Sequence, residues 1–342
     1  KTDLSKPTEE MCGITDLIDY LYGRSFVKYE LNSNGTPDPV KIVKPYKRSA
    51  NGVEVNMNDY RTENALYISM EFLMEAWNEK DDLSVDDKFM YISGRIRAIH
   101  ADIRRMEYRS LCIMDVVHAA ISFYSCASYQ VNSDNYDEIC DQIKQWLLTL
   151  DEMYEDLDKF NEEDREYVLD TIDDDTMNIM MIQSPQKLAL LETSDCITEG
   201  TSRILAIINA LDSYEYYRLP ELLKDYPVVL ETMVFHALFR MKLIRMRREV
   251  LLKWVSCVRG DVPVKFVTEA LLYENEEECV SDLQACGLSV SDGKFQLKAF
   301  KLEEVKRIPI NQSKKILSEL DADRKEQGLE WIDVMLPSEG EE

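Results

Sequence analysis

Glycine and proline are scarce in this chain of 342 residues, which contains 11 and 10 of them. So few turn-forming residues argue against an all-β or disordered protein and predict a mostly helical one. Histidine is scarcer still, with 3 residues, and the sequence has no CxxC, HExxH, GxGxxG, GxxxxGK[ST] or GxSxG motif. We therefore expect no catalytic residues, no metal site and no cofactor, and a protein that is not an enzyme.

Long apolar runs are also missing. No stretch of 18 apolar residues occurs, so we expect no membrane span. The eight cysteines are scattered and most lie within apolar patterns, which is typical of reduced thiols in a cytosolic or nuclear protein. Because the chain begins at Lys1 and ends in an acidic tail, we interpret it as part of a longer protein.

Acidic residues dominate the charge, and the net charge is -25. This disfavours indiscriminate binding to nucleic acid, because phosphate contacts need Lys and Arg. The charge is uneven, however. Residues 134–175 contain 17 Asp and Glu against 3 Lys and Arg, whereas residues 240–265 contain 8 Lys and Arg against 2 Asp and Glu. The average therefore conceals two surfaces of opposite sign.

The first part of the chain has little helical periodicity. Residues 13–27 could form a short helix, and residues 32–59 are rich in Pro, Gly and Asn. The second stretch predicts an extended, irregular strap. We therefore expect residues 1–59 to be an N-terminal strap with one short helix.

Helical periodicity then runs almost unbroken to residue 256, with polar breaks near residues 80, 133, 173 and 215. The segments lack a strict sequence repeat. This pattern indicates an α-solenoid of tetratricopeptide-like helix pairs over residues 60–258.

Residues 259–305 have a different pattern, that of a winged helix. A short helix is expected near Pro263 and a second at about 275–286, stopped by Gly287. Two short strands then flank Asp292 and Gly293, a strong hairpin signal. Residues 306–342 would add a polar helix at 313–326 and an acidic tail.

The second helix of this winged helix is acidic in its first turn and has no Lys or Arg, so it would repel phosphate. We therefore expect protein contact rather than DNA reading. The candidate partner-binding residues are Glu276, Glu277, Glu278, Asp292 and Gly293.

Residues 239–254 are the strongest basic feature, and two interpretations stay open. The helix could neutralise the acidic residues 134–175, or it could form a phosphate track. One arginine could instead be buried, with Arg248 the candidate. The candidate RNA-binding residues, including two on the hairpin, are Arg240, Lys242, Arg245, Arg247, Arg248, Lys253, Lys294 and Lys298.

A second arginine-rich helix spans residues 92–106, with an apolar stripe of Ile92, Ile96, Ile99, Ile103 and Met106. At 100° per residue, Arg95 and Asp102 flank this stripe, whereas Arg97 and Arg104 point away from it. We expect Arg95 and Asp102 to be structural, with Arg95 bridging to a neighbouring helix, for which an acidic helix is the candidate. Arg97 and Arg104 would then be free for solvent, a partner or RNA.

This helix resembles the hallmark of the GANP/Sac family of mRNA-export scaffolds, Arg-x-Arg-x-Ile-Arg-x-Asp. Arg95, Arg97, Ile99 and Asp102 match that hallmark, and His100 stands where the family prefers Arg. Four further stretches agree in order with the family, at 36–49, 150–157, 210–223 and 271–297.

The resemblance implies tetratricopeptide-like helices ending in a PCI-type winged helix. It implies a scaffold that couples transcription to mRNA export at the nuclear pore, in the nucleus or at its envelope. The implied partner is a PCI-domain protein that carries a small acidic Sem/DSS-type subunit. The joint surface would bind mRNA, weakly for this chain alone. Export and pore factors would bind other segments.

Other functions share this plan. A subunit of the proteasome lid or of an initiation factor would also combine helical pairs with a winged helix. A branch of the same family could serve splicing or mitosis. The arginine-rich helix and the strap at 36–49 favour the export branch.

Overall fold

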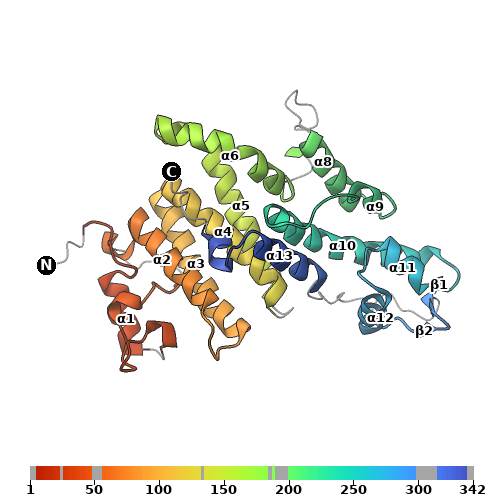
Figure 1. Ribbon diagram of the computed structural model, residues 1–342, viewed down its shortest axis with the longest axis horizontal. Helices are drawn as coiled ribbons and strands as arrows, with labels where there is room; N and C mark the ends of the chain where they lie inside the picture. Colours follow the sequence, from red (N-terminus) through yellow and green to blue (C-terminus); the bar gives the residue numbers. More distant parts are fainter. Residues whose placement is uncertain are drawn as a thin grey trace. The chain divides into compact units, whose positions relative to one another are not determined.

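The structure is a computed structural model that describes residues 5–23, 26–47, 56–131, 135–183, 187–188, 199–297 and 314–336 (Figure 1). It is mostly helical with one small sheet, which confirms the predicted fold class. The chain divides into two compact units. The first contains residues 1–127, 142–171 and 324–342, and the second contains residues 128–141 and 172–323.

The N-terminal part of the first unit is the expected strap with one short helix. Helix α1 (Ile14–Gly23) is followed by three short 3-10 turns, η1 (Lys28–Glu30), η2 (Pro39–Lys41) and η3 (Met57–Asp59). Asp38 begins η2 by accepting a hydrogen bond from the amide of Val40 at 3.2 Å. Residues 1–4, 24–25 and 48–55 lie outside the described part, and the limits of the strap at 1 and 59 remain a prediction.

Five long helices follow, α2 (Glu63–Asn78), α3 (Val85–Met106), α4 (Leu111–Gln130), α5 (Tyr136–Glu155) and α6 (Glu162–Met180), with a 3-10 turn, η5 (Leu157–Lys159), before the last. The first two begin at capping hydroxyls. Thr62 accepts a hydrogen bond from the amide of Ala65 at 3.3 Å, and Ser84 accepts one from the amide of Asp87 at 3.1 Å.

The structure differs from the expected helix boundaries at two places. Helix α6 continues through residue 173, where a break was expected, because polar residues alone do not end a helix without a glycine, a proline or a competing cap. An unexpected break separates α3 from α4, where Glu107 takes a left-handed conformation with φ 53°. The break near 80 is confirmed, and that near 133 falls on residues outside the described part.

The core of the first unit is aromatic. Phe123 of α4 packs edge to face on Trp77 of α2 and stacks on Phe89 of α3, with ring centroids 5.2 and 6.2 Å apart. Among the described helices, α4 is the one that is long and apolar enough to cross a membrane. However, 72% of its apolar window is buried within the protein, as in the core helix of a folded domain.

The second unit contains α8 (Glu199–Asp212), α9 (Leu219–Leu222), the turn η6 (Leu230–Thr232) and the long helix α10 (Met233–Cys257). The break near 215 is confirmed by the residues that separate α8 from α9. Helix α13 (Lys314–Glu326) matches the expected polar helix, and α14 (Trp331–Met335) in the first unit was not expected.

After α10 the elements are β1 (Val262–Pro263), α11 (Val264–Ala270), α12 (Glu276–Ala285), β2 (Val290–Ser291) and β3 (Lys294–Phe295). The strands form an antiparallel sheet in the order β1-β3-β2, with Phe295 opposite both Val262 and Val290. Asp292 and Gly293 have φ of 52° and 69°, as a two-residue hairpin turn requires. This is the order of elements expected for a winged helix. The limits of that domain at 259 and 305 remain a prediction.

Candidate interaction surfaces

The strap is fastened to α3 by Arg95. Its Nη2 lies 2.7 Å from Glu30 Oε1 and 2.8 Å from the hydroxyl of Tyr20, and its guanidinium stacks on the ring of Tyr91 with 3.8 Å to the ring centroid. Arg95 and Glu30 are both buried. The structural role predicted for Arg95 fits this contact. The expected partner was wrong, because the carboxylate comes from η1 of the strap and not from a neighbouring helix.

Asp102 makes the second fastening, two turns further along α3. Its two carboxylate oxygens accept hydrogen bonds from Lys44 Nζ and Arg61 Nε, each at 2.8 Å. Arg61 is fully buried, and Lys44 also donates to the backbone carbonyl of Asp59. One carboxylate therefore binds two cations, Lys44 and Arg61, which precede and follow residues 48–55 in the sequence.

Arg97 is not free, contrary to the expectation. It is half-buried, and its guanidinium lies 4.6 Å from the ring centroid of Tyr46. The amide of Tyr46 in turn donates to the carbonyl of Gly94 at 3.2 Å. Arg104 is exposed as expected, and its nearest carboxylate oxygen, on Glu152, is 3.9 Å away. The remaining hallmark residue, Ile99, is fully buried in the core.

The hallmark side chains therefore act together, and each polar one binds the strap or its continuation. The residues that they bind, Tyr20, Glu30, Lys44, Tyr46 and Arg61, were not singled out from the sequence. A usable signal was present in the strap, because "KIVKPYK" at 41–47 alternates cations with apolar residues in an acidic chain.

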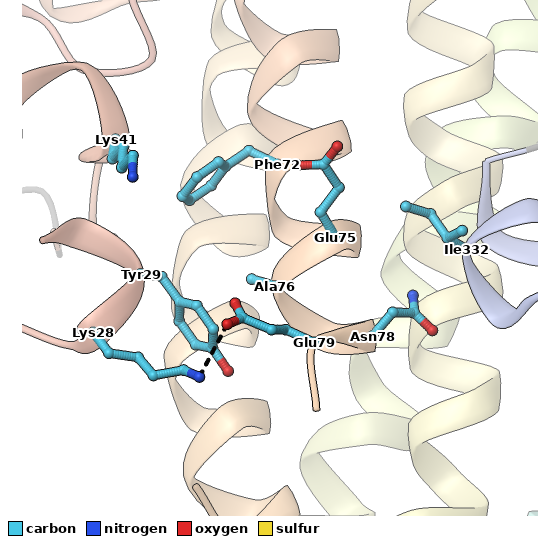
Figure 2. Close-up of a pocket in the computed structure, with 9 residues that line it drawn as sticks. All are labelled: Lys28, Tyr29, Lys41, Phe72, Glu75, Ala76, Asn78, Glu79 and Ile332. Atoms are coloured by element: carbon cyan, nitrogen blue, oxygen red, sulfur yellow. Dashed lines mark hydrogen bonds and ion pairs between the residues drawn. The ribbon is translucent and has the colours of Figure 1, made fainter. Parts of the chain in front are cut away.

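The strap also borders a hollow of about 530 Å³ that is lined in part by α2 (Figure 2). Figure 2 shows Lys28 and Tyr29 on the strap side, Phe72 on α2 and Ile332 of α14 on the far side. Lys28 Nζ lies 2.8 Å from Asp81, which follows α2. Burial opposes ionisation of Asp81, but hydrogen bonds from Lys28 and Tyr29 hold its pKa below the usual range. This ion pair adds a third fastening for the strap.

Helix α10 also buries arginines. Arg247 donates from Nε to the carbonyl of Leu271 at 2.7 Å and from Nη2 to that of Leu272 at 2.5 Å. Its guanidinium stacks on Tyr273 with 3.7 Å to the ring centroid. The prediction that Arg248 is the buried arginine was wrong: Arg248 is exposed, and Arg247 connects α10 to the turn between α11 and α12.

Arg240 is the second buried arginine of α10. It donates to the carbonyl of Ser128 at 3.2 Å, and its guanidinium lies over the rings of Tyr129 and Tyr136. Because Arg240 and Arg247 are buried and bind carbonyl oxygens, neither fits the predicted role as an RNA contact.

The other candidate cations of the second unit lie nearer to solvent. Arg245, Arg248, Lys253 and Lys294 are exposed. Lys242 is half-buried, with its Nζ 3.2 Å from Asp212, and Lys253 lies over the ring of Tyr214. Lys298 lies outside the described residues. The exposed cations of α10 are thus fewer than its composition indicates.

The acidic end of α12 faces solvent. Glu276 and Glu277 are exposed and border a shallow hollow of about 470 Å³ together with Val280, Ser281 and Gln284. Glu278 is half-buried, and its carboxylate accepts a hydrogen bond from the amide of Glu274 at 3.0 Å. Glu278 is therefore part of the helix cap. Asp292 and Gly293 are exposed at the hairpin turn.

The histidines have ordinary packing roles. His100 Nε2 lies 2.8 Å from the hydroxyl of Thr149, and burial lowers the pKa of His100 to about 4. His236 Nε2 lies 2.8 Å from the carbonyl of Pro227. His118 lies on α4, on the other side of the Glu107 break from His100. Within the described ranges, no group of three or more His, Cys, Asp or Glu residues is arranged to hold a metal ion.

The sequence matches the SAC3/GANP family over residues 11–292, from the strap to the hairpin turn. The chain belongs to the SAC3/GANP family. No curated protein matches it. Membership suggests an mRNA-export-related scaffold from a generally non-enzymatic family that is associated with nuclear export machinery. The matched range of this SAC3/GANP chain includes α3 and the strap residues Glu30 and Lys44 that α3 binds.

Proposed function

We propose that this chain is a non-catalytic scaffold of a nuclear mRNA-export complex that couples transcription to export at the nuclear pore. The family match over residues 11–292 carries this proposal. The buried fastenings of Arg95 and Asp102 support it, because they fix the strap in place on the helices. The polar hallmark residues thereby hold the strap on α3 and are not available as catalytic groups.

The proposed partner is a PCI-domain protein that carries a small acidic Sem/DSS-type subunit. It would bind the winged helix formed by residues 259–305. The exposed carboxylates of Glu276 and Glu277 support protein contact on α12, because they would repel nucleic acid. Asp292 and Gly293 would contribute the exposed turn of the hairpin.

Co-purification with mass spectrometry from the native cell tests the complex. A PCI-domain protein with a small acidic subunit and export factors are the expected companions, at the nuclear envelope or pore. Subunits of the proteasome lid or of an initiation factor would support the main alternative. Splicing or mitotic factors would place the chain in another branch of the family.

The winged-helix interface needs a test other than deletion. Removing α11 and α12 would take away the two carbonyl groups that bind buried Arg247, so a deletion would damage α10 as well. The charge reversal Glu276→Lys with Glu277→Lys leaves that contact in place, and we expect it to weaken recovery of the partner. Glu162→Lys with Glu163→Lys is the matched control, since these residues are exposed in the first turn of α6. Equal loss in both variants would place the interface elsewhere.

The chain would contribute to a composite RNA surface with its partner. The exposed cations Arg245, Arg248 and Lys253 support this, whereas the net charge of -25 predicts weak binding by the chain alone. RNA binding that depends on the partner is therefore the expected result.

A further inference from the structure

Four aromatic rings form a continuous row in the second unit. Tyr216 contacts Tyr217 and Trp254 edge to face, with ring centroids 6.0 and 5.3 Å apart. Trp254 in turn lies 5.6 Å from Phe266, with the two ring planes inclined at 31°. The row therefore joins the segment between α8 and α9, the last turn of α10 and the helix α11. We call these four residues the aromatic row.

Both ends of the aromatic row are exposed. Tyr217 is 69% exposed and Phe266 is 47% exposed, while Tyr216 and Trp254 are half-buried. Among the described residues of the second unit, the exposed large hydrophobic residues are Tyr217, Phe266 and Val258, and Val258 follows Trp254 by four positions. The exposed apolar surface of this unit is thus concentrated at one place, which a folded protein rarely maintains without a use.

Three of the four aromatic residues have a cationic residue as their immediate neighbour in the sequence. Arg218 follows Tyr217, Lys253 precedes Trp254, and Lys265 precedes Phe266. Two of these cations have carboxylate partners in exposed pairs, Arg218 with Glu215 at 2.7 Å and Lys265 with Glu269 at 4.0 Å. Exposed pairs of this kind contribute little, so a phosphate could displace the carboxylate.

We propose that the aromatic row is a base-stacking platform for unpaired RNA. Exposed aromatic rings on the same short segments as cations suit a single strand, because its bases present flat faces and its backbone carries one charge per nucleotide. A purely apolar protein partner would not account for the exposed cations Arg218 and Lys265, which neighbour the two exposed rings in the sequence. The inference rests on the proposed function and deepens it, since it assigns base contacts in addition to the phosphate contacts of α10.

Binding of the full chain to two oligomers of equal length tests the platform. One is oligouridylate, and the other is an abasic strand that keeps the phosphates and lacks the bases. Fluorescence anisotropy at low salt reports both affinities. We expect the wild-type chain to prefer oligouridylate, and Tyr217→Leu with Phe266→Leu to reduce that preference by about tenfold or more, since stacking contributes roughly 1–3 kcal/mol per base. The abasic strand should bind both proteins equally.

Tyr22→Leu is the matched control, because Tyr22 is an 89% exposed tyrosine in the first unit. Phe266→Tyr keeps an aromatic face and should retain the preference. Equal binding of oligouridylate by wild type and by the Tyr217 and Phe266 variant would overturn the platform. The proposed function would still stand in that case if the salt dependence of RNA binding depended on Arg245 and Arg248. A variant that loses the protein partner and keeps RNA binding would assign the row to protein contact instead. Absence of RNA binding by the wild-type chain, alone and with its partner, would overturn both the platform and the RNA role.

Discussion

Helices α3 and α10 look alike in sequence, since each is rich in arginine and each was a candidate for contact with RNA. In the structure each buries part of that charge, but the partners differ. On α3, Arg95 binds the carboxylate of Glu30 across 65 residues of sequence. On α10, Arg247 binds the carbonyl groups of Leu271 and Leu272 and lies on an aromatic ring.

The difference shows that the number of arginines in a helix does not give the area of positively charged surface that the helix exposes. A buried carboxylate such as Glu30 needs an opposite charge, so the Arg95 pair is sensitive to the loss of either member. The carbonyl groups of Leu271 and Leu272 need only donors, which a guanidinium supplies in a fixed planar arrangement. Consequently α3 fastens the strap by charge, and α10 fastens the turn between α11 and α12 by hydrogen bonds.

The largest expected effect comes from breaking the charge pair on α3. Arg95→Ala should lower the free energy of unfolding by about 3–5 kcal/mol, because it leaves the buried carboxylate of Glu30 without its cation. Arg97→Ala should cost less than about 1 kcal/mol, since Arg97 is half-buried and its guanidinium stacks on Tyr46 without a buried carboxylate being left behind there. Urea denaturation of both variants, with the midpoint and slope compared, measures the difference.

A double substitution distinguishes the loss of the whole ion pair from the loss of one of its two charges. Arg95→Met with Glu30→Gln removes both charges and keeps most of the volume, so it should recover much of the stability that Arg95→Ala removes. If Arg95→Ala is no less stable than the wild type, the buried pair does not hold the strap to α3.

The second effect concerns the neighbours Arg247 and Arg248 on α10. Arg247→Ala should lower the free energy of unfolding by about 2–4 kcal/mol, because two carbonyl groups lose their donors. Arg248→Ala should change it by less than about 0.5 kcal/mol, as expected for an exposed position. Thermal unfolding of the two variants provides the comparison, and equal stabilities would contradict the assignment of Arg247 as the buried arginine.

This pair also shows where inference from sequence ends. Adjacent residues on a helix differ by 100° in direction, so the buried arginine can be chosen only if the buried face is known. The spacing from Leu252 and Val255 favours Arg248, but the structure leaves both of these apolar residues half-buried. The buried face is instead defined by Leu243, Met246, Val250 and Leu251. Because α10 is apolar on several sides, its periodicity does not identify that face.

The elements themselves were easier to predict than their contacts. The stripe of α3, the hairpin turn at Asp292 and the acidic start of α12 follow from local rules of spacing, φ angle and capping. The partners of Arg95 and Asp102 do not, because they depend on how a strap without periodicity lies against the helix. Glu30 is one carboxylate among 65 Asp and Glu residues, and nothing local distinguishes it.

A third comparison uses the buried histidine on each helix. Burial lowers the pKa of His100 on α3 to about 4, with nearby Arg104 adding to the shift. Burial also lowers the pKa of His236 on α10, where the carbonyl of Pro227 and Glu319 oppose the shift. Both histidines bind a proton more readily in the unfolded chain, so protonation favours unfolding as the pH falls below about 6.5.

The loss of stability should therefore develop between pH 6.5 and about 4 and amount to about 3 kcal/mol for His100. His100→Gln should flatten the dependence of the free energy of unfolding on pH across this window, and His236→Gln should flatten it less. Urea denaturation at several pH values gives the slopes. A slope that His100→Gln leaves unchanged would mean that His100 is not held neutral in the folded protein.

The smallest effect on stability, and the one that tests function, belongs to the exposed arginines. Arg245→Ala with Arg248→Ala should leave folding unchanged. In the complex with the proposed PCI partner, it should flatten the salt dependence of RNA binding by about 1.4 in slope, roughly 0.7 for each phosphate that is no longer neutralised. Arg104→Ala with Arg105→Ala removes the same charge from the exposed side of α3 and is the control. The effect should not depend on RNA sequence, because phosphate contacts carry no base information. Equal slopes in the two variants would mean that α10 offers no phosphate track, and the exposed arginines of both helices would then only offset the acidity of the chain.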